Sequence, residues 1–148
     1  MSELIGRELT PSLYDLLSRR MATVVVGTID HDGHPHTAPY NQIYAMDCRH
    51  LRLAINRQDA TYQSLCQRGL TMIEVLEEGD IAVGLKGQAR VVAQNMEANC
   101  NLALVEIEVT EVKRDNSAYY LVSQGVRTRH REEPFLLMQR KIMTELKG

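Results

Sequence analysis

The chain has 148 residues, and its 17 Lys and Arg residues against 19 Asp and Glu residues give a formal net charge of −2. This balance excludes a broadly basic nucleic-acid-binding protein. With 44% apolar and 24% charged residues, the composition is that of a globular protein, and we expect one domain over residues 1–148.

The sequence carries no sign of export or of a membrane anchor. The N-terminus contains acidic residues and lacks the apolar run of a signal peptide, and the apolar run Met21–Val26 is too short to span a bilayer. Cys48, Cys66 and Cys100 are odd in number and have no CxxC spacing, which argues against a disulfide framework and a structural zinc site. We therefore expect a cytoplasmic protein.

The first expected element is a helix that begins at Thr10-Pro11 and ends at Arg19-Arg20. Thr10 supplies a capping hydroxyl, Pro11 suits the first turn, and the two arginines suit the negative end of the helix dipole. Met21–Ile29 predicts a strand. Its valine run, Val24–Val26, is apolar on both faces and favours a central position in a sheet.

The turn Asp30–Gly33 predicts a hairpin that leads into a second strand at His34–Ala45. A third strand is expected at Leu51–Asn56, with its apolar face formed by Leu51, Leu53 and Ile55. Asp59 is the expected N-cap of a short helix that ends at Gly69. The buried side of this helix is expected to carry Tyr62, Leu65 and Cys66.

Three further strands are expected in the C-terminal half, at Leu70–Leu76, Ile81–Ala93 and Leu102–Val112. Gly87 lies inside one of them and is typical of a bulge, whereas Tyr119–Val126 fits either an edge strand or an extended loop. Pro134 begins a final helix, whose apolar face is expected to hold Phe135, Met138, Ile142 and Leu146. Six strands with short connections favour a mainly β fold, an antiparallel β-barrel with peripheral helices.

Three pieces between Ala22 and Val92 follow a familiar order. The first is the hairpin ATVVVGTIDHDGHPHTAPYNQIY with Pro35 and Pro39, the second is HLRLAINRQDATYQSL, and the third is DIAVGLKGQARVV with its central Gly87. In order and pattern they resemble the pyridoxamine 5′-phosphate oxidase-like, FMN-binding split-barrel family. The resemblance implies a six-stranded antiparallel split barrel that forms a homodimer, with two FMN sites at the subunit interface.

The resemblance also implies which residues contact the flavin. The residues beside the isoalloxazine would be His36, Thr37, Pro39 and Asn41, mostly through backbone groups. The pyrimidine and ribityl side would be lined by Ala54, Ile55 and Asn56, and the phosphate would be surrounded by Arg57, Gln58, Thr61 and Tyr62. A helix N-terminus and a fixed cation both suit a phosphate. One face of the long strand carries Lys86, Gln88 and Arg90, which either reach across the dimer to the flavin or to an anionic substrate, or form a solvated face.

The phosphate loop departs from the family pattern. Where the family commonly has Ser or Thr followed by Arg or Lys, this chain has Asp59-Ala60-Thr61. A carboxylate there competes with a phosphate for the same donors, so that Arg57 and Thr61 compensate, FMN binds weakly, or the pocket holds another molecule. The segment VRTRHREEP also lacks the family's Arg-Leu-His-Asp-Arg-like substrate motif, so the substrate stays an unidentified small molecule and no catalytic residue is assigned.

Two other chemistries compete with flavin binding. His34 and His36 share a strand face and, with His50 or Cys48, form a conceivable metal site, although exposed turn histidines are the commoner case. A haem would take its axial ligand from His31, His36, His50 or His130. We predict an FMN-binding protein, a flavin-dependent oxidoreductase without nucleic-acid or membrane partners. The alternative is a flavin- or haem-binding protein without enzymatic activity, or a cofactor-free dimer.

Overall fold

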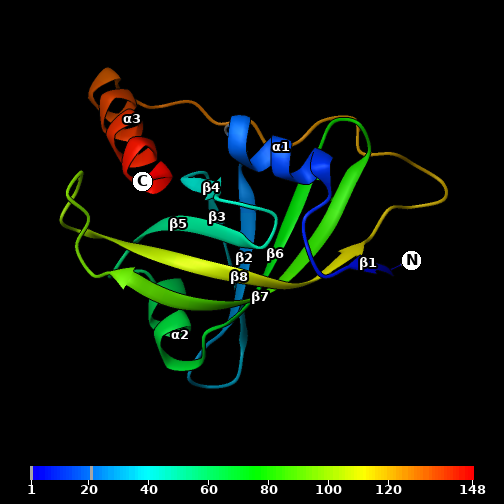
Figure 1. The fold of residues 1–148 in the computed structure, drawn as a ribbon, viewed down its shortest axis with the longest axis horizontal. Helices are drawn as coiled ribbons and strands as arrows, with labels where there is room; N and C mark the ends of the chain where they lie inside the picture. The colour runs from blue at the N-terminus through cyan, green and yellow to red at the C-terminus, as the bar shows by residue number, and fades with distance from the viewer. Residues whose placement is uncertain (1, 21) are drawn as a thin grey trace.

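A computed structural model describes residues 2–20 and 22–148 of the chain (Figure 1). In this described part, one antiparallel sheet and three helices account for all regular structure. The elements are β1 (Glu3–Gly6), α1 (Pro11–Arg19), β2 (Val24–Ile29), β3 (Pro35–Tyr40), β4 (Ile43–Ala45), β5 (His50–Asn56), α2 (Ala60–Arg68), β6 (Leu70–Glu77), β7 (Ile81–Ala93), β8 (Leu102–Arg114) and α3 (Glu133–Lys147).

The sheet curls because of the way its two ends are connected. Its strand order is β3-β2-β6-β7-β8-β5-β4, with β1 added on β8. The end strands β3 and β4 are consecutive in the chain, and only Asn41 and Gln42 separate them. A connection of this length spans at most about 10 Å, so the opposite ends of the sheet must come together. The expected mainly β split-barrel architecture is confirmed.

The interior of the curled sheet is an aliphatic core. The inward side chains of the central strands are fully buried, among them Val24, Val26, Leu53, Ile73 and Val105, each 0% exposed. Strand alternation places these residues on one face, as the sequence predicts. Leu51, Leu53 and Ile55 of β5 are likewise buried on the expected face. This core fixes the backbone on which the candidate site is built.

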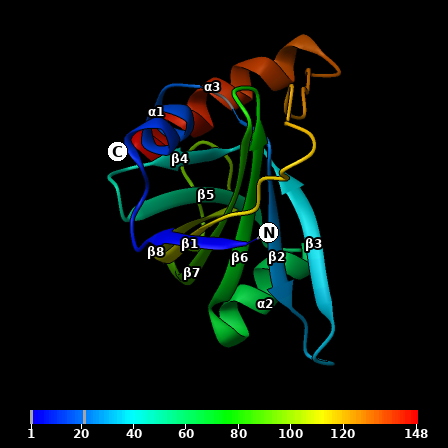
Figure 2. The same ribbon diagram turned by 90° about the vertical axis from the view of Figure 1, so that its right-hand side faces the viewer.

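The helices cover different parts of the sheet. Figure 2 shows α1 and α3 at one end of the barrel and α2 at the opposite end. The α1 helix begins as expected, because the Thr10 hydroxyl accepts a hydrogen bond from the Leu13 N–H at 3.3 Å. The α3 helix packs Ile142 and Leu146 on the outer face of the sheet, against a second apolar cluster that includes Ala54. No helix among the described residues combines the length and apolar character needed to cross a membrane.

Several strand predictions need correction. The described chain has eight strands instead of six, because β1 carries no alternating pattern and forms only by pairing with β8. The expected strand His34–Ala45 is two strands, since Asn41 and Gln42 turn the chain from one end of the sheet to the other. The first expected strand starts at Val24, and its Met21 lies outside the described residues. Val25 is half-buried, so burial on both faces is only partial, although β2 does pair with both β3 and β6.

Two predictions of buried helix residues are wrong, and the prediction of a bulge at a glycine is confirmed. Cys66 is exposed on α2 and Phe135 is 52% exposed on α3, because the sheet reaches neither position. The bulge at Gly87 is confirmed, since the β7–β8 register shifts between Lys86 and Gly87. A Cβ at Gly87 would lie 2.6 Å from Ile107 Cγ2, so the glycine also allows the two strands to approach closely.

The segment Tyr119–Val126 is an extended loop that the end of β6 holds in place. The buried Glu77 carboxylate accepts hydrogen bonds from Arg127 Nη2 at 2.7 Å and from the Gly125 N–H at 3.1 Å. The neighbouring Asp80 accepts the Val122 N–H through Oδ1 at 2.9 Å. Two carboxylates therefore supply acceptors to a loop that has no strand partner.

Candidate functional site

The corner between β5 and α2 is the centre of the predicted site. Asn56 ends β5, and its Oδ1 accepts the Gln58 N–H at 2.9 Å while its backbone carbonyl accepts the Asp59 N–H at 3.0 Å. This Asx turn brings the chain directly into α2. A small hollow of about 280 Å³ lies at the corner, lined by Asn56, Arg57, Gln58 and Asn101.

Arg57 ties this corner to the β7–β8 loop. Its Nη1 donates to the backbone carbonyls of Gln94 and Cys100, both at 2.6 Å, and its N–H donates to the Asn101 carbonyl at 3.2 Å. The remaining guanidinium N–H groups make no hydrogen bond within the described chain and are available to a ligand. Arg57 is therefore a structural anchor with donors left over.

Asp59 occupies the N-cap position of α2 without capping it. Its side chain makes no hydrogen bond to the helix, and its Oδ2 instead accepts the Tyr40 hydroxyl at 3.0 Å. Burial, together with the Asp59 carboxylate, raises the pKa of the Tyr40 phenol to about 12, so the phenol stays a neutral donor. The first-turn N–H groups of α2 are thereby left without a side-chain cap.

Thr61 adds a polar group at the same place. Its side chain is fully buried, and its Oγ1 lies beside the Tyr40 phenol but makes no hydrogen bond of ordinary geometry in the described part of the chain. A buried hydroxyl in the first turn of a helix that lacks such a bond marks a position where a ligand acceptor or a water fits.

A separate apolar groove runs over β2, β3 and β6. Its volume is about 360 Å³, and it is lined by Gly27, Thr28, Ile29, Pro35, His36, Thr37, Leu70, Thr71, Met72, Lys86 and Gly87. The strand β3 connects the two regions, because His36 and Thr37 lie in the groove and Tyr40 reaches the α2 corner. An elongated ligand that follows β3 would contact both.

The structure brings most predicted residues into these two regions. Asn56, Arg57, Gln58, Thr61 and Tyr62 lie at the corner or in the first turn of α2, and His36, Thr37 and Lys86 line the groove. Pro39 is exposed on β3, and Asn41 donates to Thr128 Oγ1 at 3.3 Å. Ala54 and Ile55 are each 1% exposed and are paired with β8, so neither is open to a ligand in this structure.

The cations of β7 have partners in the chain itself. Lys86 Nζ lies 3.0 Å from Glu111 Oε2, and Arg90 pairs with Glu106, while Gln88 is exposed opposite Glu108. These cross-strand pairs match the expectation of a solvated face. The other expectation, that these side chains reach a flavin across a dimer interface, stays a prediction.

Tyr40 is the site residue that sequence reasoning missed. It lies 19 residues from Asp59 in the chain, and no local pattern connects a strand-end tyrosine with a later helix cap. The competing histidine cluster has little support here: among residues 2–20 and 22–148 no group of three His, Cys, Asp or Glu side chains could hold a metal ion.

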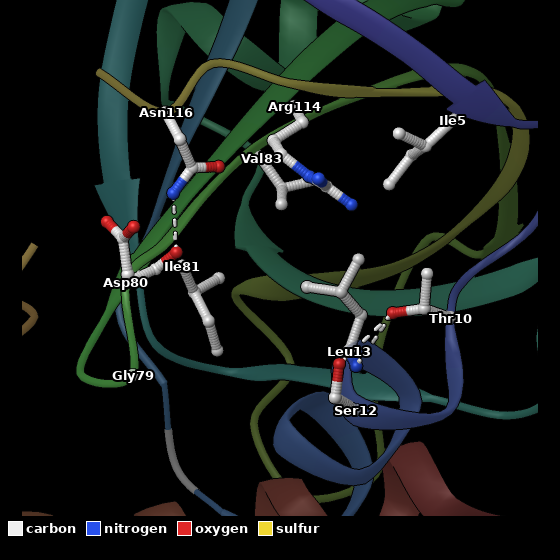
Figure 3. A pocket seen from close by; sticks show the side chains of 10 residues that line it. All are labelled: Ile5, Thr10, Ser12, Leu13, Gly79, Asp80, Ile81, Val83, Arg114 and Asn116. Carbon is white, nitrogen blue, oxygen red and sulfur yellow. Dashed lines mark hydrogen bonds between the residues drawn. The ribbon is translucent and has the colours of Figure 1, made fainter. Parts of the chain in front are cut away.

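Another cavity, of about 420 Å³, opens at the α1 end of the barrel (Figure 3). Figure 3 shows the Arg114 guanidinium directed toward Ile5 and Leu13, while Asn116 Nδ2 donates to the Asp80 carbonyl at 2.6 Å. None of the predicted site residues lines this cavity.

Comparison with known proteins supports the fold. No family model and no curated protein matches the sequence. Among solved structures, a proposed pyridoxamine 5′-phosphate oxidase from Lactobacillus delbrueckii is 20% identical, with a TM-score of 0.65 over 76% of this chain and 98% of that one. The chain has a split-barrel fold.

Two further structures share this fold. An FMN-binding protein from Syntrophomonas wolfei is 13% identical, with a TM-score of 0.55 over 68% of this chain and 80% of that one. An FAD-binding protein from Mesorhizobium loti is 12% identical, with a TM-score of 0.58 over 79% of this chain and 99% of that one. At these identities the likeness is one of fold.

Proposed function

We propose that this protein binds FMN, with the phosphate at the N-terminus of α2 and the rest of the cofactor along β3. The observation that carries the proposal is the uncapped start of α2, where the Asp59 carboxylate is held by Tyr40 and does not occupy the helix N–H groups. A helix N-terminus with free N–H groups is a ready site for a phosphate.

The residues at the corner fit this cofactor. The Thr61 hydroxyl is buried without a hydrogen bond of ordinary geometry, and Arg57 keeps guanidinium N–H groups that the β7–β8 loop does not use. The acidic residue that departs from the family pattern has its own donor in Tyr40. Arg57 therefore supplies a cation at the corner where Ala60 lacks one.

We further propose that the protein is an oxidoreductase acting on a small molecule. A bound flavin supplies hydride or electron transfer, and the chain supplies orientation and a dry surface for the ring. The groove over β2, β3 and β6 has mainly apolar walls beside His36 and Thr37, which suits a planar ring. No side chain is assigned as acid, base or nucleophile.

The homodimer is part of the same proposal. The outer face of β3 exposes Pro35, Thr37 and Pro39, and β3 is an edge strand with no second partner in the described chain. An exposed edge beside an apolar groove is a surface that natural proteins usually cover. Light scattering after size exclusion tests this, and a monomer at micromolar concentration would contradict it.

The first experiment is the visible absorbance spectrum of the purified protein, with mass identification of any released cofactor and a calorimetric titration with FMN. A flavin spectrum, or saturable FMN binding, supports the proposal. A haem band, or a colourless protein that also refuses added FMN, contradicts it. Reduction and reoxidation of the flavin with a nicotinamide donor then distinguishes an enzyme from a carrier.

A variant tests the position of the phosphate. Ala60→Lys should tighten FMN binding several-fold, because it restores a cation in the first turn of α2. Gln67→Lys is the matched control, since Gln67 is an exposed residue of the same helix in its last turn. Equal effects of the two substitutions would show that the phosphate is not at this helix end.

A further inference from the structure

A groove between α1 and α3 is a positively charged hollow. It has a volume of about 350 Å³ and lies where both helices pack against β4. Figure 2 shows this end of the barrel, opposite α2. None of the residues placed at the proposed flavin site lines the groove.

Four cations line this groove: Arg19, Arg20, Arg140 and Lys147. No Asp or Glu is among its described lining residues, although the whole chain has a net charge of −2. A concave surface lined by charges of one sign raises the local concentration of ions of the other sign. The groove is therefore a local reversal of the protein's overall charge.

The cations are only weakly engaged within the chain. Arg19 lies 3.1 Å from Asp15 and Arg20 lies 3.4 Å from Glu78, and both partners in each of these two ion pairs are more than half exposed. Surface pairs of this kind contribute little and exchange readily for another anion. The Arg140 guanidinium has no hydrogen bond or ion pair in the described chain, so it is a free donor at the groove.

Apolar and aromatic side chains form part of the remaining walls, together with the polar Ser18, Gln139 and Thr144. Leu136 is 37% exposed, and Met143 and Tyr44 are half-buried beside it. Lys147 Nζ lies 5.7 Å from the centre of the Tyr44 ring, within the range of a cation–π contact. The groove thus combines fixed positive charge with a surface on which a flat apolar group can pack.

We propose that this groove binds a small amphipathic anion, a compound with a phosphate or carboxylate head and a flat apolar body. Arg140 contacts the head, since a guanidinium forms two parallel hydrogen bonds with such groups. Leu136, Met143 and Tyr44 contact the body. This site is separate from the proposed flavin site and does not depend on it.

The test is a calorimetric titration of the full chain with phenyl phosphate, inorganic phosphate and phenol at one ionic strength. Phenyl phosphate should bind saturably and more tightly than inorganic phosphate, and phenol should show no binding. Arg140→Gln and Arg20→Gln should each weaken phenyl phosphate binding, the former at least tenfold, which is about 1.4 kcal/mol at 25 °C.

Matched variants separate this groove from general surface charge. Lys141→Gln removes the same charge from the next residue of α3, which lines a different hollow, and should change affinity less than twofold. Leu136→Ser should weaken phenyl phosphate binding and leave inorganic phosphate binding unchanged. Equal losses in Arg140→Gln and Lys141→Gln, or no saturable binding, would overturn the proposal. Loss of phenyl phosphate binding in Arg57→Ala, with no loss in Arg140→Gln, would place the ligand at the proposed flavin site and would overturn the proposal equally.

Discussion

Replacing Glu77 with Gln should destabilise the protein in a pH-dependent way. The Glu77 side chain is only 8% exposed and accepts hydrogen bonds from Arg127, Gly125 and Glu78. Hydrogen bonding to Arg127 is the main cause that lowers the pKa of this carboxyl from 4.5 to about 2. The folded state therefore prefers the ionised carboxylate much more strongly than the unfolded state does.

The magnitude follows from linkage. The difference between a pKa of 4.5 and one of about 2 sets a ceiling of about 3 kcal/mol on the contribution of this carboxylate to the free energy of unfolding. Arg127 is 55% exposed, so solvent screening reduces the expected contribution to about 1–2 kcal/mol. Because the folded pKa is the lower one, this stability is fully present above about pH 5 and is lost as the pH falls toward about 2.

The assay is urea unfolding followed by circular dichroism, at pH 7 and pH 3, with one protein concentration and one ionic strength. Glu77→Gln should lose about 1–2 kcal/mol at pH 7 and less than half of that at pH 3. Glu78→Gln is the control, since that side chain is 57% exposed and has one contact at 3.4 Å. If Glu77→Gln lost the same free energy at both pH values, or no more than Glu78→Gln, the reasoning would be refuted.

Three further predictions concern the corner and the sheet. Arg57→Ala should weaken FMN binding by about 1–3 kcal/mol and also lower the melting temperature, because it removes donors from the Gln94 and Cys100 carbonyls; Arg68→Ala, at the exposed end of α2, should do neither. In an alkaline titration followed by absorbance at 295 nm, Tyr40→Phe should lack a step near pH 12 that the unmodified protein shows. Loss of a step near pH 10 instead would contradict the buried Tyr40–Asp59 contact. Gly87→Ala should cost about 1–3 kcal/mol in urea unfolding, because its Cβ would lie 2.6 Å from Ile107 Cγ2 and 3.0 Å from the Glu108 carbonyl; Gln88→Ala, which is exposed, is the control.

The secondary structure was predictable where its signals are local. The Thr10-Pro11 cap begins α1, Gly69 ends α2 with a φ of 70°, and the strand expected at Leu102–Val112 is β8. The failures have one common cause. β1 exists because β8 offers it a partner, and the break at Asn41 and Gln42 exists because the sheet closes there.

Some features of the candidate site were likewise predictable from local sequence signals, and others were not. The helix start after β5, with Arg57 before it and Thr61 in its first turn, was visible in the sequence through the turn and cap residues. The direction of the Asp59 carboxylate was not, because Asp59 serves as a cap only if no closer donor exists. Tyr40 is that donor, and the curled sheet places it there.

Caps, turns and alternation act over a few neighbouring residues, so they predict the three helices, most of the strands, the buried face of β5 and the residue types at the corner. Which of those residues are free to bind depends on contacts between distant parts of the chain. Tyr40 and Asp59 meet across 19 residues and Glu77 and Arg127 across 50, and the cations of α1 and α3 meet over β4. Contacts of this kind depend on how the sheet closes on itself, and no local pattern encodes that closure.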